Sequence, residues 1–266
     1  MLALIVIAFI VAVRLGFADA DLRLLARGRH APNAFQGKVI WITGASQGLG
    51  AELAVYLARS GAKLVLSSRT AAHLEIVKAR CLEHTSHVVV LPLDLCGSHD
   101  DIHAAAAQVD REAFGDVGID YMIHNAARHS QHPDGDPTSS KVSLCATVRH
   151  VGVTICCPGP VAALIPGSPR MVWGSQGMIL APAARSSSKL PARRCVALIA
   201  AAAAHGLDEV WMARHPILAV AYLCSMLPRL GRMLLKRVGP KRARNMKCGK
   251  SGYDISNMFS GEPVQS

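Results

Sequence analysis

The sequence of 266 residues is poor in aromatic residues, which make up 5% of it, and it lacks any cysteine pattern of a disulfide scaffold. Its eight cysteines include no Cys-x-x-Cys pair, and no group of His and Cys has metal-ligand spacing. The adjacent residues Cys156 and Cys157 lie in an apolar run, as buried thiols do. We therefore expect reduced cysteines and no bound metal.

Acidic residues are absent between Arg229 and Lys250, a stretch that holds nine Lys and Arg. The net charge of +11 arises mostly there, because the other 20 basic residues nearly balance the 18 acidic ones. A core domain that is close to neutral argues against nucleic acid as a partner. The length is sufficient for one domain of ordinary size with a full core.

The most informative stretch runs from Lys38 to Gly50 and reads KVIWITGASQGLG. Its four apolar, strand-forming residues are followed by three glycines, and then the apolar residues take helical spacing. A strand, a glycine turn and a helix N-terminus form a site for a dinucleotide pyrophosphate, because free amides and the helix dipole face its negative charge. The residues predicted to bind the dinucleotide at this turn are Gly44, Ser46, Gln47, Gly48, Leu49 and Gly50.

Segments with strand and helix patterns alternate after the glycine turn. They cover residues 47–60, 63–67, 70–83, 87–93, 98–114 and 119–124. Ser98 is the expected N-cap of the last helix, with Asp101 placed for a near capping box. The alternation predicts an α/β fold with a doubly wound parallel sheet. The stretch over 166–188, rich in Pro, Gly and Ser, is predicted to be a substrate-side loop or a disordered segment.

The spacing TGxxxGxG, followed by these elements, resembles the fingerprint of the short-chain dehydrogenase/reductase superfamily. The resemblance places Asp94, with Leu95 beside it, near an adenine ring, and it makes Asn125-Ala126 part of the turn that closes the fourth strand. It also matches Pro158-Gly159 to the Pro-Gly that ends the sixth strand. These matches imply a Rossmann-like fold that binds NAD or NADP. An alternative function for Asp94 is that of a helix cap.

The pair Ser68-Arg69 ends the second predicted strand, where the adenosine ribose lies in such folds. An acid at this place would accept a hydrogen bond from the ribose 2′-hydroxyl, whereas Arg69 would pair with a 2′-phosphate. We therefore expect NADP as the cofactor, with NADPH preferred over NADH. The alternative is that Arg69 is a solvated loop residue.

The catalytic part of the superfamily pattern is missing. The resemblance implies a Ser that ends a fifth strand and a Tyr-x-x-x-Lys helix, but residues 128–140 are polar and rich in turn formers. No tyrosine of the chain has a lysine four residues later, and Pro137 stands four residues before Lys141. Lys141 is the one candidate remnant of the catalytic set, against the alternative of a solvated lysine. The sheet is expected to lack one strand and the catalytic helix region.

Two further segments point to a membrane. Residues 1–18 are predicted to be an N-terminal anchor, since Met1–Val13 is wholly apolar and a weaker apolar extension follows Arg14. The basic residues after it favour a domain that faces the cytoplasm. Residues 216–266 are predicted to be a basic, membrane-associated tail, because the apolar run Ile217–Leu227 precedes the cationic stretch. The alternatives are a buried or interfacial helix for the N-terminal segment and, for the tail, a helix packed on the domain or a nucleic-acid-binding segment.

The sequence therefore predicts three parts: the anchor, a dinucleotide-binding domain over 36–215 and the tail. The chain resembles the membrane-anchored, plant-type dehydrogenase/reductase member-seven-like group, which implies the endoplasmic reticulum membrane. The resemblance implies NADP(H)-dependent carbonyl/hydroxyl interconversion on an apolar, lipid-, sterol- or retinoid-like substrate, here with impaired catalysis. The alternative is a non-enzymatic dinucleotide-binding or membrane-scaffold protein, and the oligomeric state stays open.

Overall fold

The computed structural model describes residue 16 and residues 18–109, 118–126, 152–162, 170–174, 177–181 and 189–247. For residues 170–174, 177–181 and 240–247 it describes the backbone alone. The chain forms two compact units, one made of Arg29–Val151 and the other of Met1–Gly28 with Gly152–Ser266. The predicted dinucleotide-binding domain over 36–215 is divided between these units.

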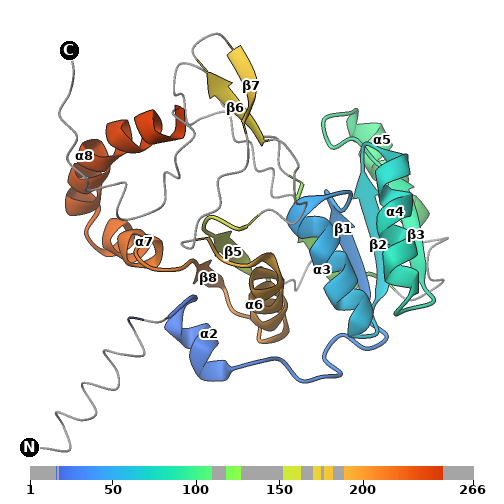
Figure 1. Ribbon diagram of the computed structural model, residues 1–266. Coiled ribbons are helices and arrows are strands. Elements are labelled where there is room, and N and C mark those ends of the chain that lie inside the picture. The colour runs from blue at the N-terminus through green and yellow to red at the C-terminus, as the bar shows by residue number, and fades with distance from the viewer. Residues whose placement is uncertain are drawn as a thin grey trace, which may run out of the picture. The chain divides into compact units, whose positions relative to one another are not determined.

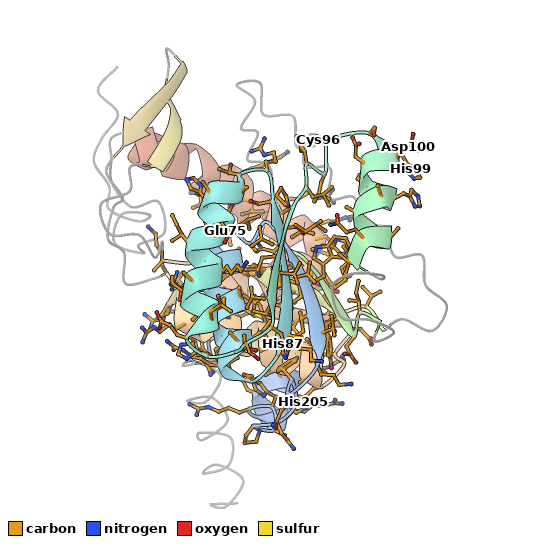
Figure 2. The ribbon with its side chains drawn as sticks, turned by 90° about the vertical axis from the view of Figure 1, so that its right-hand side faces the viewer. Glu75, His87, Cys96, His99, Asp100 and His205 are labelled. Atoms are coloured by element: carbon orange, nitrogen blue, oxygen red, sulfur yellow. The ribbon has the colours of Figure 1, made fainter. Side chains whose placement is uncertain are left out.

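The unit formed by Arg29–Val151 contains a parallel sheet of four strands in the order β3-β2-β1-β4 (Figure 1). The strands are β1 (Val39–Thr43), β2 (Lys63–Ser68), β3 (Val88–Pro92) and β4 (Tyr121–His124). The helices are α3 (Gly48–Arg59), α4 (Ala71–Leu82) and α5 (His99–Gln108). The helices α4 and α5 cover opposite faces of the sheet (Figure 2). This arrangement confirms the prediction of an α/β fold with a doubly wound parallel sheet.

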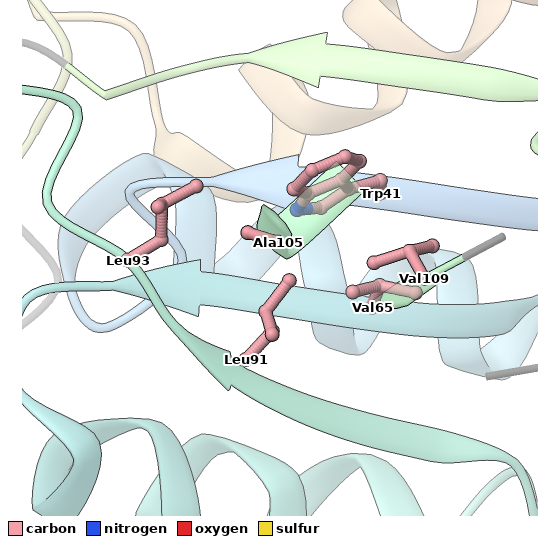
Figure 3. Close-up of a cluster of buried hydrophobic side chains, with 6 residues drawn as sticks. All are labelled: Trp41, Val65, Leu91, Leu93, Ala105 and Val109. Carbon is pink, nitrogen blue, oxygen red and sulfur yellow. The ribbon is translucent and has the colours of Figure 1, made fainter. Parts of the chain in front are cut away.

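The central strand β1 explains why the sheet needs helices on both faces. All five of its residues are buried, as expected for a parallel strand that has neighbours on both sides. On the face toward α5, a buried cluster joins the sheet to the helix (Figure 3). The members of this cluster are Trp41, Val65, Leu91, Leu93, Ala105 and Val109. Its one polar side-chain group is satisfied, because the indole Nε1 of Trp41 donates a hydrogen bond of 2.8 Å to Ser67 Oγ.

Helix α5 begins as the sequence predicts. The Ser98 hydroxyl accepts a hydrogen bond of 3.1 Å from the Asp101 amide, and the Asp101 carboxylate accepts one of 3.3 Å from the Ser98 amide. The two bonds form a complete capping box and satisfy two amides that the helix itself leaves free. The predicted end of this helix, beyond Val109, lies outside the described residues.

The second unit has two small sheets. The strand β5 (Ile155–Pro158) pairs in parallel with β8 (Glu209–Met212), and helix α6 (Ala192–Ala204) contacts both strands. The strands β6 (Arg170–Gly174) and β7 (Gly177–Ala181) form an antiparallel hairpin, so the prediction of a loop over 166–188 is wrong for these residues. The remaining helices are α2 (Leu22–Arg27), α7 (Ile217–Met226) and α8 (Pro228–Lys247). The segment where the missing strand is predicted, between residues 127 and 151, lies outside the described residues.

The segment that begins at Ala18 is firmly packed in the second unit. Arg194 donates two hydrogen bonds, of 2.8 and 3.0 Å, to the carboxylate of Asp19. Ala18, the last residue of the predicted anchor, is buried in a cluster with Ala213 and Leu218. Residues 1–15 of that anchor lie outside the described residues. Among the helices that the structure describes, none combines the length and the hydropathy needed to cross a bilayer.

An ion pair joins the starts of β1 and β4. The Nζ atom of Lys38 lies 2.7 Å from Asp120 Oδ1, and the amide of Val39 donates a hydrogen bond of 2.9 Å to Asp120 Oδ2. Burial by itself would raise the pKa of Asp120, but the hydrogen bonds from Lys38 and Val39 outweigh this effect and hold the pKa below its ordinary value. The ionised carboxylate therefore stabilises the folded state.

Replacement of Asp120 by Asn should lower the thermal unfolding midpoint at neutral pH. Because the folded-state pKa is lowered, the contribution of Asp120 is fully present above the unfolded pKa of about 3.9 and is lost as the pH falls through the folded pKa. The difference between wild type and variant should thus be constant near neutrality and shrink below about pH 4. Circular dichroism melts across this range test the expectation, with Glu83→Gln as the control for loss of an exposed carboxylate. A difference that does not change with pH would contradict it.

Candidate functional site

The turn between β1 and α3 packs against the loop that follows β4. Gly44 has a φ of 67°, a left-handed conformation that glycine adopts readily. A Cβ atom at Gly44 would lie 2.7 Å from the Cα of Ala126 and 2.9 Å from its nitrogen. A Cβ atom at Gly50 would collide with the carbonyl oxygen of Gly44 and with Asn125 Nδ2. The two glycines therefore permit a close approach of backbones that any side chain would prevent.

Thr43, at the end of β1, holds the two loops together. Its hydroxyl accepts hydrogen bonds from the amides of Asn125 (3.2 Å) and Ala126 (3.3 Å), and it donates one to the carbonyl of Ile123 (3.3 Å). The side-chain amide of Asn125 donates in turn to the carbonyl of Gly44, at 3.1 Å. Thr43 is not among the residues predicted from the sequence, although its place directly before Gly44 in the glycine motif is a signal that could have identified it.

The N-terminus of α3 is open to an anionic ligand. Its N-cap residue, Gln47, is exposed and its side chain makes no capping bond, and the first turn contains no acidic residue. Gly48 is exposed, with a φ of 61°, and a Cβ atom there would meet no atom within 4 Å. Ser46 and Leu49 are half-buried beside it. The amides of this turn, which the helix cannot satisfy, are the groups that bind phosphates in such motifs.

The carboxyl ends of β2 and β3 lie beside the turn. The amide of Ala45 donates to the carbonyl of Ser67 (3.1 Å), and the amide of Leu93 donates to the carbonyl of Ser68 (3.0 Å). The side chain of Arg69 is exposed, and no described residue forms an ion pair or hydrogen bond with its guanidinium. The structure therefore brings the predicted positions at 44–50, 68–69 and 125–126 to the same edge of one sheet.

Asp94 and Leu95 are exposed on the loop after β3. The Asp94 carboxylate accepts a hydrogen bond of 3.0 Å from the amide of Cys96, which closes a local turn. It does not cap α5, because Ser98 occupies that position. The alternative of a helix-cap acid is therefore wrong, and Asp94 remains available at the edge of the sheet where the resemblance places the adenine ring.

Two predicted positions belong to the other unit. Pro158 ends β5 and Gly159 follows it, and the Gly159 amide donates a hydrogen bond of 2.7 Å to the carbonyl of Met212. A Cβ atom at Gly159 would lie 2.7 Å from the Cβ of Ala213, so glycine is needed for the packing of the loops after β5 and β8. Lys141 lies outside the described residues. The described part of the chain contains no group of three metal-ligating side chains.

Comparison with known proteins gives consistent matches. Residues 38–187 match the sequence model of the family described as short chain dehydrogenase. The mouse (Mus musculus) protein named dehydrogenase/reductase SDR family member 7 is 30% identical in an alignment of 300 positions that covers 86% of this chain and 87% of that protein. Its human (Homo sapiens) counterpart is 29% identical, with 87% of each chain covered. A very-long-chain 3-oxoacyl-CoA reductase from Aspergillus terreus is 29% identical over 65% of this chain and 47% of its own length.

The close approach of Gly44 to Ala126 should make Gly44→Ala more destabilising than Gly48→Ala, although the two substitutions have the same backbone cost. Gly44→Ala and Gly48→Ala both place a Cβ atom in a left-handed conformation, which costs about 1–2 kcal/mol. Only Gly44→Ala also forces the turn away from Ala126. We expect a clearly larger drop in the thermal midpoint for Gly44→Ala, while Gly48→Ala keeps a native circular dichroism spectrum. Equal losses in the two variants would show that the contact with Ala126 is unimportant.

Proposed function

The chain belongs to the short-chain dehydrogenase family and groups with dehydrogenase/reductase SDR family member 7, and we propose that it binds NADP(H) and has impaired catalysis. The family consists of oxidoreductases that bind NAD or NADP. The observation that carries the proposed cofactor preference is the exposed Arg69 at the end of β2, beside the open N-terminus of α3.

The residues at the carboxyl edge of the sheet fit such a cofactor. The space kept free by Gly44 and Gly50 and the uncapped amides of α3 suit a pyrophosphate. Arg69 would pair with a ribose 2′-phosphate, a charge-assisted contact that NADH does not offer. Asp94 and Asn125 would border the adenine and the inner part of the site. The bound cofactor supplies hydride transfer, and the protein holds it in place.

Impaired catalysis is supported by the tyrosines. The family reaction needs a proton donor beside the carbonyl, and no tyrosine of the chain has a lysine four residues later. The hydroxyl of Tyr56 is hydrogen-bonded to His30 Nε2 at 3.0 Å, and the ring of Tyr121 packs against Phe35. The alignment with the mouse relative extends over 300 positions, more than the 266 residues of this chain, so the relative has residues without counterparts here. This length supports the absence of a central segment.

The substrate class and the location are further parts of the proposal. The Aspergillus relative is named for a very-long-chain acyl substrate, which favours an apolar, lipid-like carbonyl compound if this chain retains turnover. We place the protein at the endoplasmic reticulum membrane with its domain toward the cytoplasm, attached through residues 1–18 and through the basic tail over 216–266.

A second candidate is a dinucleotide-binding or membrane-scaffold protein without enzymatic activity. One contrast favours this second candidate. The described dinucleotide turn is complete, whereas the Tyr-x-x-x-Lys pattern is absent from the sequence. Binding without turnover would support this function.

Isothermal titration tests the cofactor assignment. Arg69→Ala should lose about 1.5–3 kcal/mol of binding free energy for NADPH, the value of a hydrogen bond to a charged group, and little for NADH. Arg59→Ala, at the other end of α3, is the matched control and should bind both cofactors as the wild type does. Equal losses for NADPH and NADH in Arg69→Ala would remove Arg69 from the site.

Measurement of the turnover rate tests the proposed impairment of catalysis. General acid–base catalysis contributes about 10²–10⁴-fold to rate, so we expect NADPH oxidation with apolar carbonyl compounds at no more than roughly a hundredth of the rate of the mouse relative. Gly48→Asp, which places a negative charge at the phosphate-binding turn, gives the background rate. A purified, monodisperse wild-type sample that matches the relative would refute the impairment and would direct the search for a proton donor to residues 128–141.

A further inference from the structure

The helices α7 and α8 form a hairpin, defined here as residues 217–247, that packs on its unit through the start of α7 (Figure 1). Helix α7 has 10 residues and is apolar on nearly all sides, yet Leu218 is its one buried residue. Leu218 packs with Ala18 and Ala213, and Ile217 and Tyr222 pack against this cluster. The start of the hairpin is thus attached to its unit through the first turns of α7.

The two helices pack tightly against each other. Gly231 of α8 is buried, and a Cβ atom there would lie 2.7 Å from both the Cα and the Sγ of Cys224 in α7. Leu234 and Val238 follow at three and seven residues, on the same side of α8, and are half-buried. The start of α8 is therefore in close contact with the end of α7 at Gly231 and Cys224.

The rest of the hairpin surface combines exposed apolar and cationic side chains. Met226 is 74% exposed and Met233 67% exposed. The exposed large apolar residues are Met226, Leu227, Leu230, Met233 and Leu235. The exposed cationic residues between and beside them are Arg229, Arg232, Lys236 and Arg237. The sequence contains no acidic residue between Val210 and Tyr253. Exposed apolar side chains gathered on one element indicate a site of interaction.

We propose that the hairpin docks on the surface of a bilayer that contains anionic lipids. Met226, Leu227 and Leu230, at the junction of the two helices, enter the boundary between headgroups and acyl chains, and the cations pair with lipid headgroups. The lipid charge matches the hairpin, whereas a second copy would bring two sets of cations together and repel. A nucleic acid would satisfy the cations and leave the exposed methionines and leucines without a partner.

The inference rests on the membrane association proposed above and adds the lipid class and the contacting residues. It requires neither the cofactor nor turnover, so its failure is distinguishable from failure of the proposed oxidoreductase function. Because Met1–Val13 is wholly apolar, the full chain has a second source of vesicle binding that does not depend on lipid charge. The informative quantity is therefore the excess affinity for anionic over neutral vesicles.

Sedimentation of the full chain with vesicles measures this excess. Wild type should bind phosphatidylcholine vesicles that contain phosphatidylserine more tightly than phosphatidylcholine alone, with the difference abolished by high salt. Each cation near an anionic surface contributes about fivefold, so replacing Arg229, Arg232, Lys236 and Arg237 by Gln should lower the excess by roughly two orders of magnitude or more. The matched control replaces four exposed arginines elsewhere by Gln, namely Arg23, Arg29, Arg59 and Arg80. Equal excess in the two quadruple variants would overturn the proposal.

A second measurement, which does not depend on the quadruple variant, is the depth to which the junction of α7 and α8 enters the bilayer. Trp introduced by Met226→Trp should be quenched by lipids brominated on their acyl chains, whereas Leu82→Trp, at an exposed position of α4, should not be. Equal quenching would overturn the proposal. The protein could instead form a dimer in vesicle-free solution that becomes a monomer in the double variant Met226→Gln with Leu230→Gln. This result would assign the surface to a second copy and would also overturn the proposal.

Discussion

The dinucleotide-binding unit depends on the close approach of the backbone at Gly44 to the loop after β4. No Cβ atom fits at Gly44, and the Thr43 hydroxyl satisfies both amides of the Asn125–Ala126 loop. This contact joins the ends of two parallel strands that lie some 80 residues apart in the sequence. It also directs the chain into α3 with free amides at the helix start, which is the arrangement a phosphate requires.

The other contacts of the sheet stabilise this edge without belonging to the dinucleotide turn. The cluster around Trp41 fixes α5 on one face, and the bond from its indole to Ser67 leaves no unsatisfied donor beneath the site. At the opposite edge, Asp120 ties β4 to β1 through Lys38 and the Val39 amide. The strand β4 is thus held at both of its ends, although it is short and lies at the border of the described sheet.

The two units differ in what they contribute. The unit of Arg29–Val151 holds the dinucleotide turn, together with Arg69, Asp94 and Asn125. The other unit holds the α7–α8 hairpin, whose exposed apolar and basic residues are unrelated to a cofactor site. A chain with impaired catalysis could therefore keep both cofactor binding and membrane attachment, because neither depends on the groups that transfer the proton.

Local patterns predicted the elements of the first unit well, since each pattern acts within a few residues. The capping box at Ser98 and the alternation of strands and helices are both of this kind. The hairpin of β6 and β7 was missed because the surrounding Pro, Gly and Ser concealed two short apolar runs, Met171–Trp173 and Met178–Leu180. The packing of Ala18 into the second unit was also missed, because it depends on residues almost 200 positions away.

The sequence by itself determined the family, the strand–turn–helix that binds the dinucleotide and the lack of a Tyr-x-x-x-Lys pattern, because each is written in contiguous residues. The tertiary structure alone decided why Gly44 and Gly50 are glycines, which residue links the two loops and which acid caps α5. It also showed which apolar residues of α7 and α8 stay exposed. These are properties of contacts between distant segments, and no local pattern records which atoms the fold will bring within reach.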